Sequence, residues 1–281
     1  MSNICQSMCF VATLVLITGL QSSNYLLADE PALNFATAQD VVFRAKVDNS
    51  DQRYVIVLPE QFAIDKTYSL LIALHGHGSD RWQFVKSPRD ECRAARDAAT
   101  RHGMIFVSPD YRAKTSWMGP AAEADLIQII ANLKTKCRIN RVILSGGSMG
   151  ASSSLSFAAM HPKLIDGIVA MNGTANHLEY ENFQLAIQES FGGSKTEVLN
   201  QYKIRSAEYW PEQFTMPVGI TTGGKDKSVP PDSVLRLASI LQKLKHRVLV
   251  IHRPETGHST THLDATAIYE FVIQQSSKKT K

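Results

Sequence analysis

Residues Val142 to Ser152 read Val-Ile-Leu-Ser-Gly-Gly-Ser-Met-Gly-Ala-Ser and form the most informative stretch of the chain. The apolar start of this stretch predicts a buried strand, and the residues that follow Gly150 predict a helix. Between them lies the pattern G-x-S-x-G, in which a tight strand-to-helix turn holds a serine in a strained conformation. Glycine at Gly146 and Gly150 lets strand and helix approach closely. We therefore expect Ser148 to present its hydroxyl as a nucleophile at the carboxyl end of a strand.

A serine hydroxyl is a weak nucleophile at neutral pH, so it needs a general base, normally a histidine that a carboxylate orients. His258 is the best candidate, because it follows the predicted strand 247–251 through a loop in which Gly257 allows the chain to turn back over the sheet. Other histidines fall at a strand end, at helix ends or just inside a helix, where a structural or solvated role is favoured: His252, His102, His161, His246 and His262.

Asp226 is the favoured orienting carboxylate. It lies in the segment 223–230, directly after the predicted strand 217–222. Two alternatives have simpler explanations, since Asp232 precedes a helical run as an N-cap would, and Glu255 suits a solvated loop. The order Ser148, Asp226, His258 is the order in which nucleophile, acid and base follow one another in folds that contain this elbow.

The oxyanion of a tetrahedral intermediate needs backbone donors near the serine. The N–H group of Met149 is one, because it lies at the N-terminus of the helix that follows the elbow. The second is expected in the loop after the third strand, where the sequence is His75-Gly76-His77-Gly78. We predict the backbone N–H of His77, with that of Gly78 as the alternative, whereas the His75 side chain is expected to hold the loop.

Strand-like and helix-like segments alternate along the chain, which predicts an α/β fold with a mostly parallel, doubly wound sheet. Runs at 41–47 and 53–58, separated by turn residues, predict an antiparallel N-terminal hairpin. The irregular stretch 172–214 predicts a short cap insertion with one short helix, whose packed face would be formed by its apolar residues Leu178, Tyr180, Phe183, Leu185 and Ile187. The other strands are expected at 69–74, 104–107, 142–145, 165–171, 217–222 and 247–251, and helices at 88–102 (with Ser87 as N-cap), 120–136, after the elbow, 232–245 and 262–274.

The ends of the chain differ from the rest in composition. Residues 10–20 are nearly all apolar, which is the length of a signal-peptide core and too short to span a bilayer. No lysine or arginine precedes this core, and cleavage after Ala28 would place Leu26 at the −3 position, so a buried helix or an uncleaved anchor stays open. We predict a signal peptide at 1–28, a linker at 29–40, a catalytic domain at 41–276, a basic tail at 277–281, and a secreted or periplasmic protein without a stable membrane span.

Composition excludes several classes of function. Of the 281 residues, 44% are hydrophobic and 20% are charged, as in ordinary globular domains, and the net charge of +4 is scattered apart from the C-terminal tail, so nothing favours a nucleic-acid partner. Cys92 and Cys137 remain after loss of the signal peptide and form no metal-binding pattern. They fall in helices expected on opposite faces of the sheet, so we predict that both are free thiols.

The motif His75-Gly76-His77-Gly78, the segment Gly146 to Gly150, Asp226 and His258 resemble the α/β-hydrolase superfamily from about residue 41 to the end. Within it, the chain is similar to secreted esterases of the feruloyl/acetyl-xylan esterase and polyhydroxybutyrate depolymerase type, and to the catalytic domain of prolyl oligopeptidase-like peptidases. It departs from oligopeptidases because only about forty residues precede the first strand, and from dienelactone hydrolases because its nucleophile is Ser148 and not cysteine.

This resemblance implies serine hydrolase chemistry without a metal or an organic cofactor. We expect cleavage of carboxylic esters, with a small-molecule or carbohydrate-linked ester as substrate. The stretch 172–214 is too short and polar to form a broad apolar lid, so short acyl groups or bulky alcohols such as sugars are expected, while Trp117 and Trp210 are expected to serve packing more than substrate stacking. A serine peptidase with the same residues, and a non-catalytic binding protein with this fold, remain the alternatives.

Overall fold

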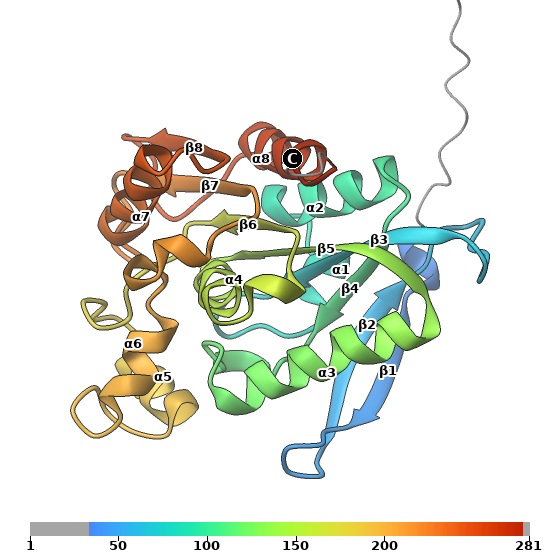
Figure 1. Cartoon of the computed structure of the whole chain (residues 1–281), viewed down its shortest axis with the longest axis horizontal. Coiled ribbons are helices and arrows are strands. Elements are labelled where there is room, and N and C mark those ends of the chain that lie inside the picture. Colours follow the sequence, from blue (N-terminus) through green and yellow to red (C-terminus); the bar gives the residue numbers. More distant parts are fainter. Residues whose placement is uncertain (1–33, 278–281) are drawn as a thin grey trace, which may run out of the picture.

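The computed structural model describes residues 34–277. In this range eight strands form one sheet in the order β1-β2-β4-β3-β5-β6-β7-β8 (Figure 1). Strand β2 pairs antiparallel with β1 and β4, and all other neighbours are parallel, so the predicted α/β class with an antiparallel N-terminal hairpin is confirmed. The strands are β1 (Gln39–Arg44), β2 (Asp51–Val57), β3 (Thr67–Leu74), β4 (Ile105–Pro109), β5 (Arg138–Gly147), β6 (Gly167–Met171), β7 (Val218–Gly223) and β8 (Val248–Arg253).

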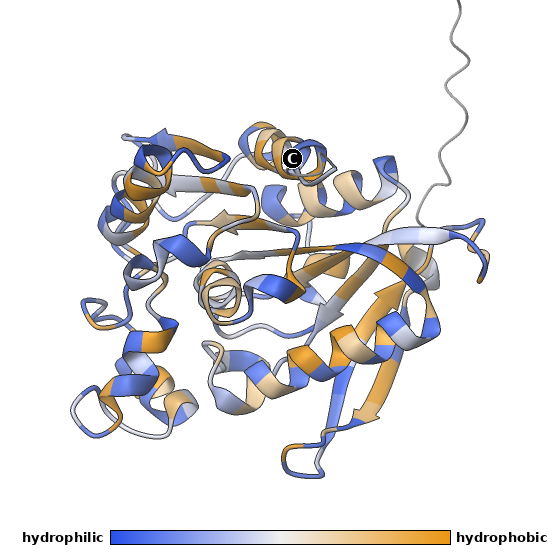
Figure 2. Ribbon diagram, in the orientation of Figure 1, coloured by the Kyte–Doolittle hydropathy of each residue, from blue (hydrophilic) through white to orange (hydrophobic). Residues whose placement is uncertain are grey.

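Helices cover both faces of this sheet. Helices α2 and α8 pack together on one face, and α3, α4 and α7 contribute to the apolar core on the other. The strands of the centre are coloured mainly as hydrophobic, whereas α3 alternates hydrophobic and hydrophilic residues along its length (Figure 2). The helices are α1 (Gln83–Lys86), α2 (Asp90–Arg101), α3 (Pro120–Lys136), α4 (Met149–Met160), α5 (Gln184–Phe191), α6 (Leu199–Arg205), α7 (Asp232–Lys243) and α8 (His262–Ser276).

Helix α3 has the predicted bounds, but the prediction for 88–102 was wrong at its start. A separate single turn, α1, precedes this region, and the longer helix α2 begins only at Asp90, with Arg89 as its N-cap. Ser87 is therefore not an N-cap, because it lies at the C-terminal end of α1, where its Oγ accepts a hydrogen bond from the N–H of Arg89. This turn places Gln83 against the loop that follows β3, where its Oε1 accepts a hydrogen bond from the N–H of Gly76.

The cap stretch 172–214 is more helical than expected. It contains α5, α6 and two short 3₁₀ turns, not one short helix. Tyr180 and Ile187 are buried as predicted, but Leu185 is 84% exposed and Phe183 is 39% exposed, so the apolar face of α5 is narrower than the sequence indicated. Short helices like these are stabilised mainly by tertiary packing, so the periodicity of the sequence alone does not predict them.

The two cysteines of the domain are free thiols, as predicted. Cys92 on α2 belongs to the core on one face of the sheet, and Cys137, after α3, packs against the core on the other. Burial raises the pKa of the Cys92 thiol to about 12, so it stays protonated at neutral pH.

The predicted signal peptide at 1–28 lies outside the described residues, as do most of the predicted linker and nearly all of the basic tail. Among residues 34–277, no helix has the length and apolar character needed to cross a bilayer.

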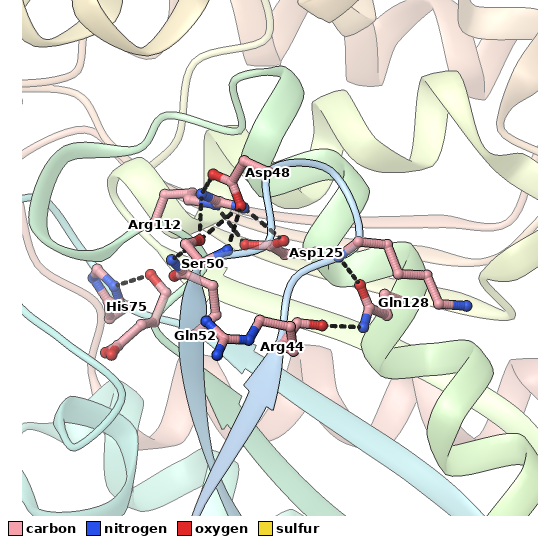
Figure 3. A network of polar contacts seen from close by, with 10 residues as sticks. Arg44, Asp48, Ser50, Gln52, His75, Arg112, Asp125 and Gln128 are labelled. Carbon is pink, nitrogen blue, oxygen red and sulfur yellow. Dashed lines mark hydrogen bonds and ion pairs between the residues drawn. The ribbon is translucent and has the colours of Figure 1, made fainter.

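A polar network fixes the N-terminal hairpin to the domain. The guanidinium of Arg112 lies between Asp48, in the β1–β2 turn, and Asp125 on α3 (Figure 3). Both carboxylate oxygens of Asp125 accept hydrogen bonds from Arg112, at 2.6 and 2.9 Å. On the same helix, Gln128 bonds to the backbone of Arg44 and Lys46 at the end of β1. Side chains of α3 thus hold the edge of the sheet in place, in addition to the strand ladder that joins β1 to β2.

The variant Arg112→Met is expected to destabilise the fold by about 3–5 kcal/mol, because it leaves the carboxylate of Asp125 buried and unpaired. The Asp125 side chain is only 1% exposed, so water does not replace the lost partner. Urea denaturation checks the value. The double variant Arg112→Met/Asp125→Leu should recover most of the loss, whereas equal destabilisation of the single and double variants would show that the contact with Asp48 accounts for it.

His177, in the cap stretch, gives the fold a specific acid sensitivity. Its ring is fully buried, and this burial, together with the positive charges of Arg205 and Lys195, lowers its pKa to about 3. Below its ordinary pKa of 6.5 the unfolded chain binds a proton at this position and the folded chain does not. Stability is therefore lost as the pH falls from 6.5 towards 3.

The variant His177→Gln should lack this contribution to the pH dependence. In the native chain, His177 lowers the free energy of unfolding by about 2 kcal/mol at pH 5 relative to pH 7, since each pH unit below 6.5 lowers it by about 1.4 kcal/mol. The measurement is the free energy of unfolding in urea at both pH values for both proteins. An identical change with pH in the two proteins would contradict a neutral, buried His177.

Candidate active site

Ser148 occupies the sharp turn between β5 and α4, as the elbow pattern predicts. Its backbone has φ 58° and ψ −120°, a strained conformation for a residue with a side chain. The two outer glycines are required here, because a Cβ on Gly146 would lie 2.4 Å from the carbonyl carbon of Gly150, and one on Gly150 would lie 2.1 Å from the oxygen of Leu74. Close packing of strand, turn and helix therefore fixes the position of the Ser148 side chain.

His258 and Asp226 come together as predicted. Asp226 lies in the loop after β7 and His258 in the loop after β8, and Nδ1 of His258 is 2.6 Å from Oδ2 of Asp226. The other oxygen of Asp226 accepts hydrogen bonds from the N–H groups of Ser228 and Val229, at 2.9 Å each. Asp226 is 5% exposed, so these contacts fix its orientation. Since Nδ1 faces an acceptor, Nδ1 carries the proton and Nε2 is left as the basic nitrogen.

Ser148 and His258 border the same cavity, which has a volume of about 250 Å³. Within residues 34–277 the Ser148 hydroxyl makes no hydrogen bond to the ring of His258, and catalytic hydrogen bonds are often long in ligand-free sites. The cavity is also bordered by side chains from α1, α2 and the cap stretch, so it is an open cleft between the loops after β3, β5 and β8 and the start of α5.

The predicted oxyanion donors lie near this cavity, since His77 borders it and Met149 directly follows Ser148. No acceptor in the described part of the chain takes a hydrogen bond from the N–H group of His77 or of Met149. A Cβ placed on Gly76 would lie 3.7 Å from Cβ of Ser148, so the loop after β3 passes directly beside the elbow. By contrast, the N–H of Gly78 donates to the oxygen of Lys114, which leaves His77 as the better of the two loop candidates.

The histidine side chains of this loop have structural contacts. The buried ring of His75 is within hydrogen-bond distance of the oxygens of Gly76 and Asp110, which holds the loop as predicted. Nδ1 of His77 accepts a hydrogen bond from Nε1 of Trp117. Burial lowers the pKa of His77, and the neighbouring His75 adds to this, so the ring is neutral at physiological pH.

The rival candidates lie elsewhere. His252 is within β8 and contacts Thr222, while the other rival histidines with a side-chain partner pair with carboxylates: His102 with Glu270, His161 with Glu123 and His262 with Asp97. Glu255 is an exposed loop residue that pairs with Lys225. Asp232 borders a different cavity, and its predicted N-cap role was wrong, because Pro231 is the N-cap and α7 begins at Asp232 itself.

Several residues that border the cavity were not predicted from the sequence. They are mainly polar side chains of α1 and α2 and one aromatic ring of the cap: Gln83, Arg89, Glu91 and Phe183. The backbone of Phe183 has φ 56°, and its ring packs at 4.4 Å against that of His77. Trp117 is fully buried and Trp210 half-buried, so both serve packing as expected. In residues 34–277, no group of His, Cys, Asp and Glu is arranged to hold a metal ion.

Solved structures with the same architecture include peptidases and esterases. The Pyrococcus horikoshii acylaminoacyl peptidase has a TM-score of 0.66 and 14% identity over 89% of this chain and 43% of its own. An S-formylglutathione hydrolase from Agrobacterium tumefaciens has a TM-score of 0.65 and 12% identity over 85% and 94% of the two chains, and a ferulic acid esterase 0.62 and 16% over 85% and 97%. The chain spans between 35% and 43% of the length of the peptidase chains it resembles.

The strand order, the serine elbow and these structural likenesses define the α/β-hydrolase fold. The model of the prolyl oligopeptidase family matches residues 99–276, and the chain belongs to that family. No curated protein sequence matches it.

Proposed function

We propose that this protein cleaves carboxylic esters through an acyl-enzyme, with Ser148 as nucleophile, His258 as general base and Asp226 as the orienting carboxylate. The observation that carries this proposal is the contact of 2.6 Å between His258 and Asp226, at the border of the cavity that Ser148 also borders. Asp226 keeps the proton on Nδ1, so Nε2 is the nitrogen that receives the proton of Ser148.

In the first half of the reaction, Oγ of Ser148 attacks the ester carbonyl carbon while its proton passes to Nε2 of His258. The carbonyl oxygen becomes an oxyanion that accepts hydrogen bonds from the N–H groups of Met149 and His77. The bond from carbon to the leaving oxygen then breaks, and His258 returns the proton to the alcohol. In the second half, water attacks the acyl carbon and gives a proton to His258. His258 then passes this proton to Oγ of Ser148 as the bond between the acyl carbon and Oγ breaks, and the acid is released.

Small substituents on the acid are favoured by the size of the cleft. A cavity of about 250 Å³ is smaller than the 300–1,000 Å³ typical of sites that enclose a drug-sized ligand. A short acyl group fits such a cavity, whereas a bulky alcohol, such as a sugar, has to lie partly outside it. This favours esters with short acyl groups or carbohydrate-linked esters as substrates.

The test is a panel of acetyl, butyryl, long-chain and feruloyl esters, together with labelling by a fluorophosphonate probe and Ser148→Ala as the blank. We expect labelling of the native protein and the highest activity on acetyl to butyryl esters. Absence of both labelling and turnover would favour a non-catalytic binding protein, and a maximum at long acyl chains would contradict the small, open site.

Peptide hydrolysis is the second candidate function, and family membership favours it. The proposed mechanism also suits an amide, provided that His258 protonates the leaving amine. A p-nitrophenyl ester and a p-nitroanilide of the same acyl group separate the two functions. We expect efficient turnover of the ester, and comparable turnover of the anilide would assign the protein as a peptidase.

Export is a further part of the proposal and rests on the apolar segment 10–20. N-terminal sequencing of the mature protein from its native host tests it. A mature N-terminus close to residue 29, in a secreted or periplasmic fraction, is the expected result, and an intact residue 1 in the cytoplasm would contradict it.

A further inference from the structure

Gln83, the first residue of α1, holds its side-chain amide in one orientation. Its Oε1 accepts a hydrogen bond from the backbone N–H of Gly76 at 2.7 Å. A backbone N–H is only a donor, so the oxygen of the amide must face Gly76 and the NH₂ group must face away from it. The contact therefore fixes which end of the amide is available for other partners.

The NH₂ group has no hydrogen-bond partner within residues 34–277, and Gln83 borders the cavity of Ser148. The amide is also near the elbow, since a Cβ on Gly76 would lie 3.8 Å from Oε1 of Gln83 and 3.7 Å from Cβ of Ser148. Gln83 thus brings a neutral donor of fixed direction to the catalytic cavity, in addition to the backbone donors of His77 and Met149.

The two charged neighbours of Gln83 at the cavity differ from it. Glu91 lies in the first turn of α2, where a carboxylate interacts favourably with the helix dipole, so its position has a structural explanation. Arg89 is exposed and has no side-chain contact within the described residues that would fix its direction. Of these three side chains, only Gln83 is held by a hydrogen bond while keeping a donor free.

A free donor of fixed direction discriminates between substrates. Water satisfies it in the empty cleft, and a substrate that displaces this water either provides an acceptor in its place or leaves the donor unpaired. An ether or hydroxyl oxygen keeps the hydrogen bond, whereas a methylene group of nearly the same size loses it.

We propose that Gln83 is a specificity-determining residue whose NH₂ group binds an acceptor oxygen of the substrate close to the scissile ester. The site then favours esters with an oxygenated acyl or alcohol group over hydrocarbon esters of the same shape. This inference rests on the proposed ester hydrolysis and adds a substrate class to it.

Two isosteric substrate pairs test the inference. In the acyl pair, p-nitrophenyl methoxyacetate replaces one methylene of p-nitrophenyl butyrate by oxygen, and in the alcohol pair, 2-methoxyethyl acetate does the same for butyl acetate. The quantity measured is the ratio of kcat/KM within each pair. The intrinsic reactivity of a substrate is the same for every protein variant, so a change of the ratio between variants reports a contact with the protein.

In Gln83→Met, at least one of the two ratios should fall by about threefold to tenfold, the effect of losing one neutral hydrogen bond. Gln83→Glu should show the same fall, because it keeps an acceptor for Gly76 and loses the donor, and it decides the question if Gln83→Met does not fold. Gln274→Glu is the matched control, since Gln274 is exposed on α8 and borders none of the described cavities, and its ratios should equal those of the native protein.

If the native protein hydrolyses the esters and both ratios are unchanged in the Gln83 variants, the inference about Gln83 is wrong while the proposed function stands. If the native protein hydrolyses none of the four esters, the proposed function fails, and the inference fails with it.

Discussion

Ester turnover is expected to fall by roughly a factor of 10⁶ in Ser148→Ala, the size of effect that loss of the nucleophile has in other serine hydrolases. Alanine keeps the Cβ that is already present at φ 58°, so the strained turn is no more strained than before and the protein should remain folded. The loss then belongs to the missing hydroxyl and not to a collapsed elbow.

The measurement is kcat/KM for p-nitrophenyl acetate, together with fluorophosphonate labelling and a thermal melt of the same preparations. Ser239→Ala is the matched control, because Ser239 is exposed on α7, remote from the cavity, and makes no hydrogen bond through its side chain among the described residues. If Ser148→Ala kept more than a few per cent of the activity while folded, another residue would have to be the nucleophile.

Asp226→Asn is expected to lower kcat by on the order of 10⁴, as for the buried aspartate of comparable sites. The N–H groups of Ser228 and Val229 decide how the new amide is oriented, because both need an acceptor. Its oxygen therefore takes the place of Oδ1, and its NH₂ group faces Nδ1 of His258. The histidine then keeps its proton on Nε2, which is the wrong nitrogen for a base.

Asp232→Asn is the matched control for this change. Asp232 begins α7 and borders a cavity other than that of Ser148, so its kcat should stay within a factor of two or so of the native value, as for most surface substitutions. A large loss in Asp232→Asn with a small loss in Asp226→Asn would reverse the assignment of the acid.

The sheet and the positions of Ser148, Asp226 and His258 could be predicted because each depends on short-range patterns. The elbow needs glycine at two defined positions, and parallel strands bring the loops after their carboxyl ends to one edge. Helix α3 was predicted to the residue, since its apolar positions follow a clear helical period and Pro120 marks its first turn. The roles assigned to these residues remain predictions until the variants are measured.

The remainder of the cavity wall depends on contacts between distant segments. Nothing in the sequence around Gln83 indicates that its amide faces Gly76, because a single turn of helix has no period that could be detected. Phe183 was assigned to a packed helix face, but it precedes α5 with a positive φ, and its ring packs against that of His77 at the border of the cavity. The start of α2 was misplaced for a related reason. Serine is a residue type that favours N-caps, but Ser87 is the C-cap of α1.

The cap stretch between β6 and β7 begins and ends on neighbouring strands. Ile168 lies opposite Val218 in the parallel ladder, and the N–H of Asn172 donates to the oxygen of Thr221, so the insertion leaves the carboxyl end of β6 and returns to the amino end of β7, two points whose separation the strand pairing fixes. A longer or shorter segment at this place costs little closure entropy and leaves the strand register intact. A change of length in the exposed part of this insertion, next to Phe183, can therefore reshape the substrate cleft while the strands that carry Ser148 and His258 keep their pairing.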